Sequence, residues 1–313
     1  MRILITGGAG FIGSHLAEMH LLRGDQVHVV DDLTTGNRAN LAAFQTNPYL
    51  SFEQADVLTW HGLDARVAWA DRIYNMAAVV GMFRVLEQPV ETTRVNVLGC
   101  ERLLDAVARS GRRPQVVLPS SSSVYGPAKY EDLHERADIV ASPGAPLLNY
   151  ALSKLTNEVQ GRAYAEKYDL PIVIARLFNT VGLRQSGLYG FVVPRFVQQA
   201  QSGEPITVFG DGSQTRSFCD VRDTVAMLDA LAATPAAYGQ VVNVGNTQEI
   251  TILELAELIR ERVGSTSPLR DLRERLSVGL LVRHELHRHY RIALVPQSHV
   301  AMDRHESLIA ATG

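Results

Sequence analysis

The chain has 313 residues, of which 46% are hydrophobic, and a formal net charge of −3 at pH 7. This length suits one large or two interlocked domains with an ample apolar core. A pI near 6.4 and the absence of an extended basic run argue against a nucleic-acid-binding protein, and no apolar window approaches the roughly 18 residues of a membrane span. We therefore expect a globular protein with neither a nucleic-acid nor a membrane partner.

The chain contains only two cysteines, Cys100 and Cys219, which lie far apart and in no metal-ligand spacing. Reduced thiols in a cytoplasmic protein are the simplest interpretation, and a structural zinc site is not expected. No basic-then-apolar leader precedes the first strand, which also favours the cytoplasm.

The first predicted element is a short apolar strand over 2–6, followed at once by the sequence GGAGFIG. Gly7 can adopt the backbone angles of a tight turn, Gly10 has no Cβ to keep a pyrophosphate away, and Gly13 lets a helix lie close to the strand. The amides at the start of that helix, from about Phe11, would direct their partial positive charge at a diphosphate. The pattern predicts a dinucleotide site.

The second predicted strand, 26–31, ends in Asp31. An acid at this position would accept both hydroxyls of the adenosine ribose and would disfavour a ribose 2′-phosphate. Although Arg38 follows a few residues later, NAD is favoured over NADP. The alternative is that Asp31 is only a turn residue at the end of a strand.

Strand-like runs then alternate with helix-periodic stretches, which is typical of a parallel sheet wrapped by helices. The candidate strands are 2–6, 26–31, 50–54, 72–76, 115–119, 171–175 and 240–244, and the candidate helices are 11–23, 88–110, 150–168, 190–202, 220–233 and 251–263. Thr251, with Glu254 three residues later, predicts a capping box at the start of the last helix. We expect an α/β fold, a Rossmann-type doubly wound parallel sheet with a smaller, interleaved C-terminal substrate domain.

The expected NAD-binding domain comprises 1–175 plus about 218–245, and the expected substrate domain comprises 176–217 plus 246–313. The segment 268–313 is atypical, with poor apolar periodicity. It holds five of the ten histidines, namely His284, His287, His289, His299 and His305. It could be a solvated tail or a sequence that has drifted or changed reading frame. A metal cluster is not expected, because two histidines only two positions apart point to different faces of a helix.

The predicted strand 115–119 opens at its carboxyl end into four consecutive serines, 120–123. Ligands of open parallel sheets bind beyond these strand ends, so the serines would face a cofactor. The alternative is a polar loop that merely caps the strand.

Tyr150 and Lys154 lie four positions apart on a predicted helix, which places the phenol and the ammonium on one face. A free phenol titrates near 10, so it becomes a base at neutral pH only where a positive charge stabilises the phenolate. We expect Lys154 and an oxidised nicotinamide to provide that charge. The same spacing also occurs by chance in many helices.

A glycine-rich turn over 210–213 leads to Arg216. A planar guanidinium suits bidentate binding of phosphate oxygens, so Arg216 is a candidate for a second, substrate diphosphate. The alternative is an arginine on a surface turn.

Together, the glycine turn, the serine-ended strand and the YxxxK pair resemble the NAD-dependent nucleotide-sugar epimerase/dehydratase family of extended short-chain dehydrogenases/reductases, over residues 1 to about 266. The resemblance implies three catalytic residues, Ser121, Tyr150 and Lys154. It implies that the cofactor is bound by Gly7, Gly10, Phe11, Ile12, Gly13, Asp31, Asp56, Val57, Ala77, Ala78 and Asn96, with Tyr150 and Lys154. It implies that the substrate is bound by Ser122, Ser123, Asn179, Val208, Phe209 and Arg216.

The residues after the catalytic hydroxyl separate reactions within this family. Dehydratases place an acid pair there and UDP-glucuronate decarboxylases a glutamate, whereas this chain has Ser122 and Ser123. The segment SSSVYG over 121–126 resembles the 4-epimerases of UDP-glucose/galactose and UDP-glucuronate. This resemblance implies a 4-epimerase acting on UDP-glucose/galactose or UDP-glucuronate/galacturonate through a 4-keto intermediate. Because the segment 190–194 and the spacing from Ser121 to Tyr150 also resemble the decarboxylases, a decarboxylase or 4,6-dehydratase is the alternative. A second alternative is an NAD-binding protein with little catalysis.

The predicted helices 88–110 and 150–168 carry more apolar residues than one buried face requires. On the first helix these are Val95, Val97, Leu98, Leu103, Leu104 and Val107. The family resemblance implies that these helices pair across a two-fold axis, so we expect a homodimer. Alternatively, the surplus packs within one chain.

Overall fold

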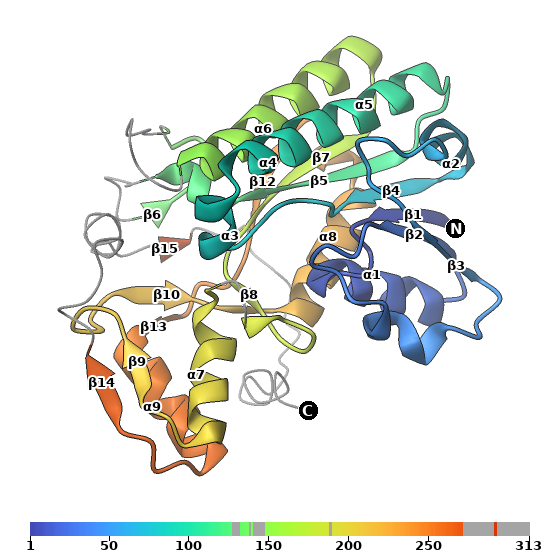
Figure 1. Ribbon diagram of the computed structural model, residues 1–313. Coiled ribbons are helices and arrows are strands. Elements are labelled where there is room, and N and C mark those ends of the chain that lie inside the picture. The colour runs from blue at the N-terminus through green and yellow to red at the C-terminus, as the bar shows by residue number, and fades with distance from the viewer. Residues whose placement is uncertain (127–131, 138, 140–147, 188–189, 272–290, 293–313) are drawn as a thin grey trace.

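The computed structural model describes residues 1–126, 132–137, 139, 148–187, 190–271 and 291–292 (Figure 1). Its centre is a seven-stranded sheet of the order β12-β7-β5-β4-β1-β2-β3, in which every neighbouring pair is parallel. The strands are β1 (Arg2–Thr6), β2 (Gln26–Asp31), β3 (Leu50–Gln54), β4 (Arg72–Asn75), β5 (Gln115–Ser121), β7 (Ile172–Leu177) and β12 (Val241–Val244). All seven were expected from the sequence, and the doubly wound Rossmann-type fold is confirmed. Most of the atypical segment, with all five of its histidines, lies outside the described residues.

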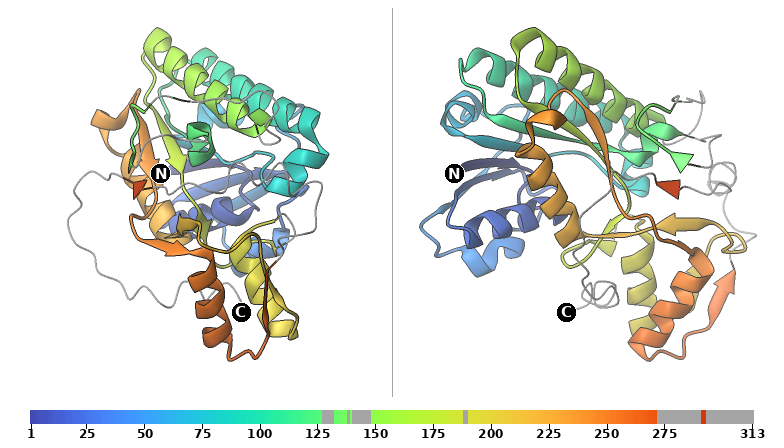
Figure 2. Two further views of the ribbon diagram at one scale, coloured as in Figure 1. Left: turned by 90° about the vertical axis from the view of Figure 1, so that its left-hand side faces the viewer. Right: turned by 180° about the vertical axis from the view of Figure 1, so that it is seen from behind.

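Helices cover both faces of this sheet. On one face lie α1 (Phe11–Leu22) and α8 (Val221–Ala232), and on the other lie α2 (Leu63–Trp69), α5 (Gly99–Arg109) and α6 (Leu148–Tyr168) (Figures 1 and 2). The sheet is covered on both faces because both faces are apolar. Alternate side chains of a strand point to opposite faces, and β1 illustrates this. Ile3 and Ile5 belong to the core beneath α1 and α8, whereas Leu4 belongs to the core beneath α2, α5 and α6.

The expected helix 88–110 is divided in the structure. It consists of α4 (Pro89–Thr93), a π-helical turn η2 (Arg94–Leu98) and α5. Apolar periodicity does not reveal such a wide turn, because it inserts one residue into an otherwise continuous pattern. The prediction also missed α2, α3 (Met82–Glu87) and the short 3-10 helices η1 (Arg38–Phe44), η3 (Ser122–Tyr125) and η5 (Pro235–Ala237).

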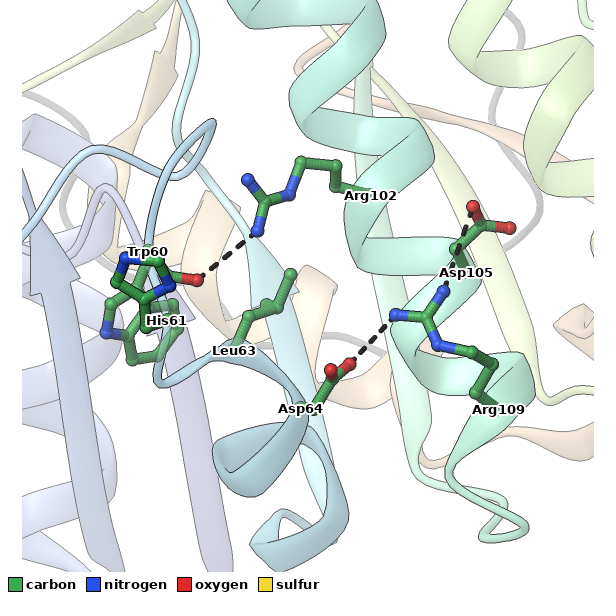
Figure 3. A pocket seen from close by; sticks show the side chains of 7 residues that line it. All are labelled: Trp60, His61, Leu63, Asp64, Arg102, Asp105 and Arg109. Carbon is green, nitrogen blue, oxygen red and sulfur yellow. Dashed lines mark hydrogen bonds and ion pairs between the residues drawn. The ribbon is translucent and has the colours of Figure 1, made fainter.

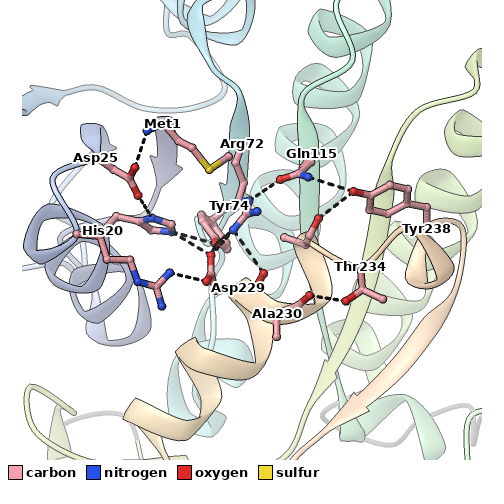
Figure 4. A network of polar contacts seen from close by, with 12 residues as sticks. Met1, His20, Asp25, Arg72, Tyr74, Gln115, Asp229, Ala230, Thr234 and Tyr238 are labelled. Carbon is pink, nitrogen blue, oxygen red and sulfur yellow. Dashed lines mark hydrogen bonds and ion pairs between the residues drawn. The ribbon is translucent and has the colours of Figure 1, made fainter.

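A buried polar network ties α1, β4 and α8 together on one side of the sheet (Figure 4). His20 binds Asp25 through Nδ1 at 2.7 Å and the Tyr74 hydroxyl through Nε2 at 3.0 Å. Tyr74 donates to Asp229 at 3.1 Å, and Asp229 also pairs with Arg72. Since buried polar groups must find partners, this network fixes how the two helices sit against the strand.

A smaller second core lies beside the carboxyl edge of the sheet, as Figure 1 shows. Its elements are α7 (Val192–Ser202), α9 (Ile252–Val263), the parallel pair β9 (Ile206–Val208) and β14 (Leu269–Asp271), and the antiparallel pair β10 (Thr215–Ser217) and β13 (Glu249–Thr251). The capping box is confirmed, because Thr251 and Glu254 exchange backbone-to-side-chain bonds of 3.1 and 2.9 Å. Two minor pairs complete the description, β8 (Thr180–Val181) with β11 (Cys219–Asp220), and β6 (Asp132–Leu133) with β15 (Arg291–Ile292).

Candidate active site

A cavity of about 1140 Å³ lies between the carboxyl ends of the sheet strands and the second core. Of the residues predicted for the site, all but Asn96 and Val208 line it. The predicted residues that line the cavity are Gly7, Gly10, Phe11, Ile12, Gly13, Asp31, Asp56, Val57, Ala77, Ala78, Ser121, Ser122, Ser123, Tyr150, Lys154, Asn179, Phe209 and Arg216. The structure thus brings segments from residue 7 to residue 216 to one place.

Close backbone contacts require glycine at two positions of the loop after β1. Gly7 has a φ of +66°, and a Cβ there would lie 2.6 Å from the Ala77 nitrogen. A Cβ on Gly13 would lie 2.3 Å from the Gly7 carbonyl oxygen. Because the N-cap Gly10 provides no side-chain bond, no capping side chain occupies the amides that open α1. Such a helix start, free of side chains and beside a cavity, fits a pyrophosphate.

Asp31 is 6% exposed, yet it lines the cavity. Its carboxylate accepts bonds from the amides of Ala9 at 3.0 Å and Leu33 at 2.8 Å. Burial raises the pKa of Asp31, and these backbone hydrogen bonds oppose the shift. The guanidinium of Arg38 lies 5.0 Å over the Phe52 ring, outside the cavity lining. This arrangement fits an unphosphorylated adenosine ribose, as NAD carries.

The three predicted catalytic side chains meet at the end of β5 and the start of α6. Ser121 hydrogen-bonds the Tyr150 phenol. Ser121 Oγ also lies 3.1 Å from Ser123 Oγ and accepts the Ser123 amide at 3.1 Å. Lys154 is 5% exposed, and its Nζ donates to the Pro119 carbonyl at 3.0 Å. The helix therefore presents phenol and ammonium to one wall of the cavity, as the i, i+4 spacing predicted.

Burial shifts the pKa values of two groups in this cluster. Burial raises the pKa of Tyr150, and the hydrogen bond from Ser121 opposes that rise. Burial also lowers the pKa of Lys154 to about 8. In the chain alone, the Lys154 ammonium donates to the Pro119 carbonyl and burial dominates the pKa of the phenol. That Lys154 and an oxidised nicotinamide lower the tyrosine pKa stays a prediction.

Two predicted contact residues lie behind the cavity wall. Asn96 is buried, accepts the Val79 amide at 2.8 Å, and donates to the Val79 carbonyl at 3.2 Å and to Ser153 Oγ at 3.0 Å. It thus holds the wall segment after β4 against α6, a role that the wide turn η2 makes possible. Val208 is buried in the second core, and its neighbour Phe209 reaches the cavity instead.

A buried ion pair supports the catalytic elements from behind, and the sequence did not reveal it. Glu158 on α6 receives two bonds from Arg176 on β7, at 2.8 and 2.7 Å, and one from Ser120 on β5 at 2.5 Å. The Arg176 guanidinium also lies 4.7 Å over the Tyr125 ring. Because the buried carboxylate and guanidinium are hydrogen-bonded to each other and the carboxylate also accepts Ser120, the network fixes β5, α6 and β7 relative to one another.

At the substrate end, Asn179 donates to the Ser217 carbonyl at 2.9 Å, and Arg216 to the Thr215 carbonyl at 2.7 Å. Sequence reasoning missed several polar side chains of the lining, namely Arg84, Glu91, Arg184, Gln185 and Arg195. No motif marks them, because their place in the cavity depends on how the two cores pack.

A second pocket, of about 320 Å³, lies between the loop before α2 and the helix α5 (Figure 3). An exposed ion pair of Arg109 with Asp64, at 2.9 Å, crosses it, and Arg102 donates to the Trp60 carbonyl at 3.3 Å. None of the predicted site residues lies there. Exposed ion pairs of this kind contribute little to folding stability. Within the described part of the chain, no group of His, Cys, Asp and Glu could hold a metal.

The fold and the site together define a dinucleotide-binding Rossmann protein with a Ser-Tyr-Lys centre. Residues 3–245 match the model of the NAD dependent epimerase/dehydratase family, and the chain belongs to this family. NAD is accordingly its cofactor, and the glycine loop and Asp31 have the geometry to bind it.

Among curated relatives, UDP-glucuronic acid decarboxylase 1 of Danio rerio is 35% identical over 87% of this chain, which spans only 63% of that relative. Among solved structures, UDP-glucuronic acid 4-epimerase from Bacillus cereus, in complex with UDP-glucuronic acid and NAD, has a TM-score of 0.85 and 26% identity, covering 99% of this chain and 97% of the other. A dTDP-glucose 4,6-dehydratase from Streptomyces venezuelae has a TM-score of 0.81 and 30% identity, covering 99% and 96%. The family is thus clear, while its neighbours carry out three different reactions.

Across residues 1–126, 132–137, 139, 148–187, 190–271 and 291–292, no helix is both long enough and apolar enough to cross a membrane.

Proposed function

We propose that the protein is an NAD-dependent epimerase that inverts C4 of a UDP-sugar, either UDP-glucose/galactose or UDP-glucuronate/galacturonate. The observation that carries this proposal is the serine cluster. Ser121 bonds Tyr150 and Ser123, and serines occupy the two positions after it. Elimination of water across C5–C6 needs a further acid and base, which serines cannot supply at neutral pH.

The positions of the cavity carboxylates also argue against dehydration, because none of them comes from the serine segment 120–123 or from α6. Within the described part of the chain, those that line it are Asp31, Asp32, Asp56 and Glu91. Asp31 ends β2 and Asp32 follows it, Asp56 follows β3, and Glu91 lies on α4 beside Arg94. Glu158 is close to the serines, but it is buried in its pair with Arg176 and outside the lining.

In the proposed reaction, Tyr150 accepts the proton of the sugar 4-hydroxyl and Ser121 hydrogen-bonds the reacting oxygen. Bound NAD⁺ supplies the hydride acceptor at C4 and a positive charge beside the phenol. The chain's own task is to orient the phenol, and the hydrogen bond with Ser121 serves this. Once the 4-keto sugar has turned over, hydride would return to its other face, and Tyr150 would give the proton back to the C4 oxygen.

A decarboxylase is the second candidate, since the Danio rerio relative is named as one. In that case Tyr150 would again accept the 4-hydroxyl proton while NAD⁺ would take the C4 hydride. Carbon dioxide would then leave C5 of the 4-keto sugar, a proton would replace it at C5, and the hydride would return to C4. A 4,6-dehydratase, as in the Streptomyces venezuelae neighbour, is less compatible with the serines. A third possibility, NAD binding with little catalysis, predicts no product at all.

The deciding experiment is to incubate the full chain and NAD separately with UDP-glucose, UDP-galactose, UDP-glucuronate and UDP-galacturonate. We expect a C4 epimer from one pair, formed from either member. UDP-xylose from UDP-glucuronate would establish the decarboxylase instead. Absence of any C4 epimer from all four sugars would overturn the epimerase proposal.

We also propose a homodimer formed by α4, η2 and α6. Exposed apolar side chains gather on these elements: Val90 is 71% exposed, Leu98 45%, Leu152 41% and Val159 62%. Part of the predicted surplus, Leu103, Leu104 and Val107, instead packs in the chain's own core. A mostly apolar face of this kind is typical of an obligate interface.

Light scattering at micromolar concentration tests this assembly. We expect a dimer mass for the native chain and a monomer mass for Val159→Glu. The matched control is Leu22→Glu, because Leu22 is 72% exposed on α1, away from these helices. A native monomer, or a Val159→Glu protein that stays dimeric, would contradict the proposal.

A cytoplasmic location is proposed on the state of the thiols. Cys100 and Cys219 are both buried and free, which suits a reducing compartment. Detection of the protein in a cytosolic fraction of its source cells is the expected result.

A further inference from the structure

Arg195 on α7 lines the cavity. Its Nη1 donates to Thr207 Oγ1 at 2.7 Å, and its guanidinium lies 4.5 Å over the Phe209 ring and 5.1 Å over the Phe196 ring. Within the described ranges no carboxylate lies within ion-pair distance of it. The charge is thus held in place by a hydroxyl and two rings.

Arg195 is half-buried, whereas Arg72 and Arg176 are buried and each has an acidic partner. Arg72 pairs with Asp229, and Arg176 pairs with Glu158 at 2.7 Å. Burial lowers the pKa of Arg195 to about 10, with no acid to oppose the shift. Because a partly desolvated cation without a counter-ion is costly, its retention beside a cavity indicates that the cavity's ligand supplies the anion.

The position of Arg195 shows which anion this is. Thr207 and Phe209 belong to β9 and the residue after it, and Arg216 on β10 lines the same cavity. These groups come from the second core, whereas the pyrophosphate cradle of the dinucleotide is built by the glycine loop after β1. An anion on this side must therefore belong to a second ligand.

We infer that Arg195 binds the diphosphate of the nucleotide-sugar substrate, together with Arg216, with its guanidinium oriented by the Phe209 ring and Thr207. This inference rests on the proposed function only in taking a nucleoside diphosphate as the second ligand. Stacking on an aromatic ring leaves the edge of the guanidinium available for phosphate oxygens. Arg195 is then a substrate-binding residue rather than a catalytic one.

The test is calorimetric titration of the NAD-saturated full chain with UDP and, separately, with uridine. For Arg195→Met we expect the Kd for UDP to rise roughly 10- to 100-fold, the loss typical of a charge-assisted hydrogen bond, while the Kd for uridine changes less than about threefold. Arg195→Lys keeps the charge and should retain more UDP affinity than Arg195→Met. The matched control is Arg262→Met, an exposed arginine of α9 outside the cavity, which should bind UDP normally.

Unchanged NAD affinity checks that each variant is folded. If Arg195→Met does not fold, Arg195→Gln removes the charge while retaining a donor for Thr207. A UDP affinity within about twofold of the native value in a folded neutral variant would overturn the inference, as would a native chain that binds none of UDP, dTDP and GDP. Failure of the epimerase proposal gives a different result, namely normal UDP binding without C4 inversion.

Discussion

The cavity has two halves that are built in different ways. The cofactor half depends on backbone approach, since a Cβ on Gly13 would lie 2.3 Å from a carbonyl oxygen. The substrate half depends on side chains carried by separate elements, such as Arg195 on α7 and Arg216 on β10. Close backbone contacts allow only glycine at certain positions of one short loop, so they produce a motif in the sequence. Side chains that meet from separate elements produce no such motif. The two halves should therefore respond separately to substitution.

The largest effect is expected where the halves meet. Tyr150→Phe removes the proton acceptor and its hydroxyl bond with Ser121, so turnover should fall roughly 10²- to 10⁴-fold. NAD and UDP affinities should remain nearly native, because the ring is retained. Steady-state rates and calorimetry measure the two effects. Near-native turnover would mean that another residue is the base.

The next effect tests the independence of the cofactor half. Asp31→Ala removes the acceptor for the Ala9 and Leu33 amides and for the ribose, so the Kd for NAD should rise roughly 10- to 100-fold. Turnover at saturating NAD and the Kd for UDP should stay close to native. Asp32→Ala is the matched control, since Asp32 also lines the cavity and its carboxylate accepts the Thr34 amide at 2.8 Å. Equal losses in both variants would place the ribose contact elsewhere.

The smallest effect concerns stability and pH. The pKa of Lys154 is lowered by burial from 10.5 to about 8, so between these values the folded chain binds fewer protons than the unfolded chain. Lys154 should therefore make the free energy of unfolding rise with pH across this window. Relative to Lys154→Met, the native chain should gain about 2 kcal/mol between pH 7.5 and 9.5, measured by urea denaturation without added NAD. A constant difference between the two proteins would show that the ammonium is not desolvated.

Prediction from the sequence succeeded where local chemistry decides the outcome. The seven sheet strands, the capping box at Thr251 and the Ser-Tyr-Lys cluster all appear where they were expected. It failed for the helix 88–110, which contains a wide turn at Asn96. Asn96 bonds Val79 and Ser153, which are distant in sequence, and apolar periodicity carries no sign of such contacts.

The sequence by itself determined the alternation of strands and helices and the glycine loop, because apolar periodicity and the lack of a Cβ act over neighbouring residues. It also placed Tyr150 and Lys154 on one helix face. Only the tertiary structure decided that the tyrosine pKa rises with burial, that Glu158 is locked to Arg176, and that Arg195 faces the cavity without an acid. Desolvation and pairing depend on groups far apart in the chain, so they exist only once the two cores have packed together.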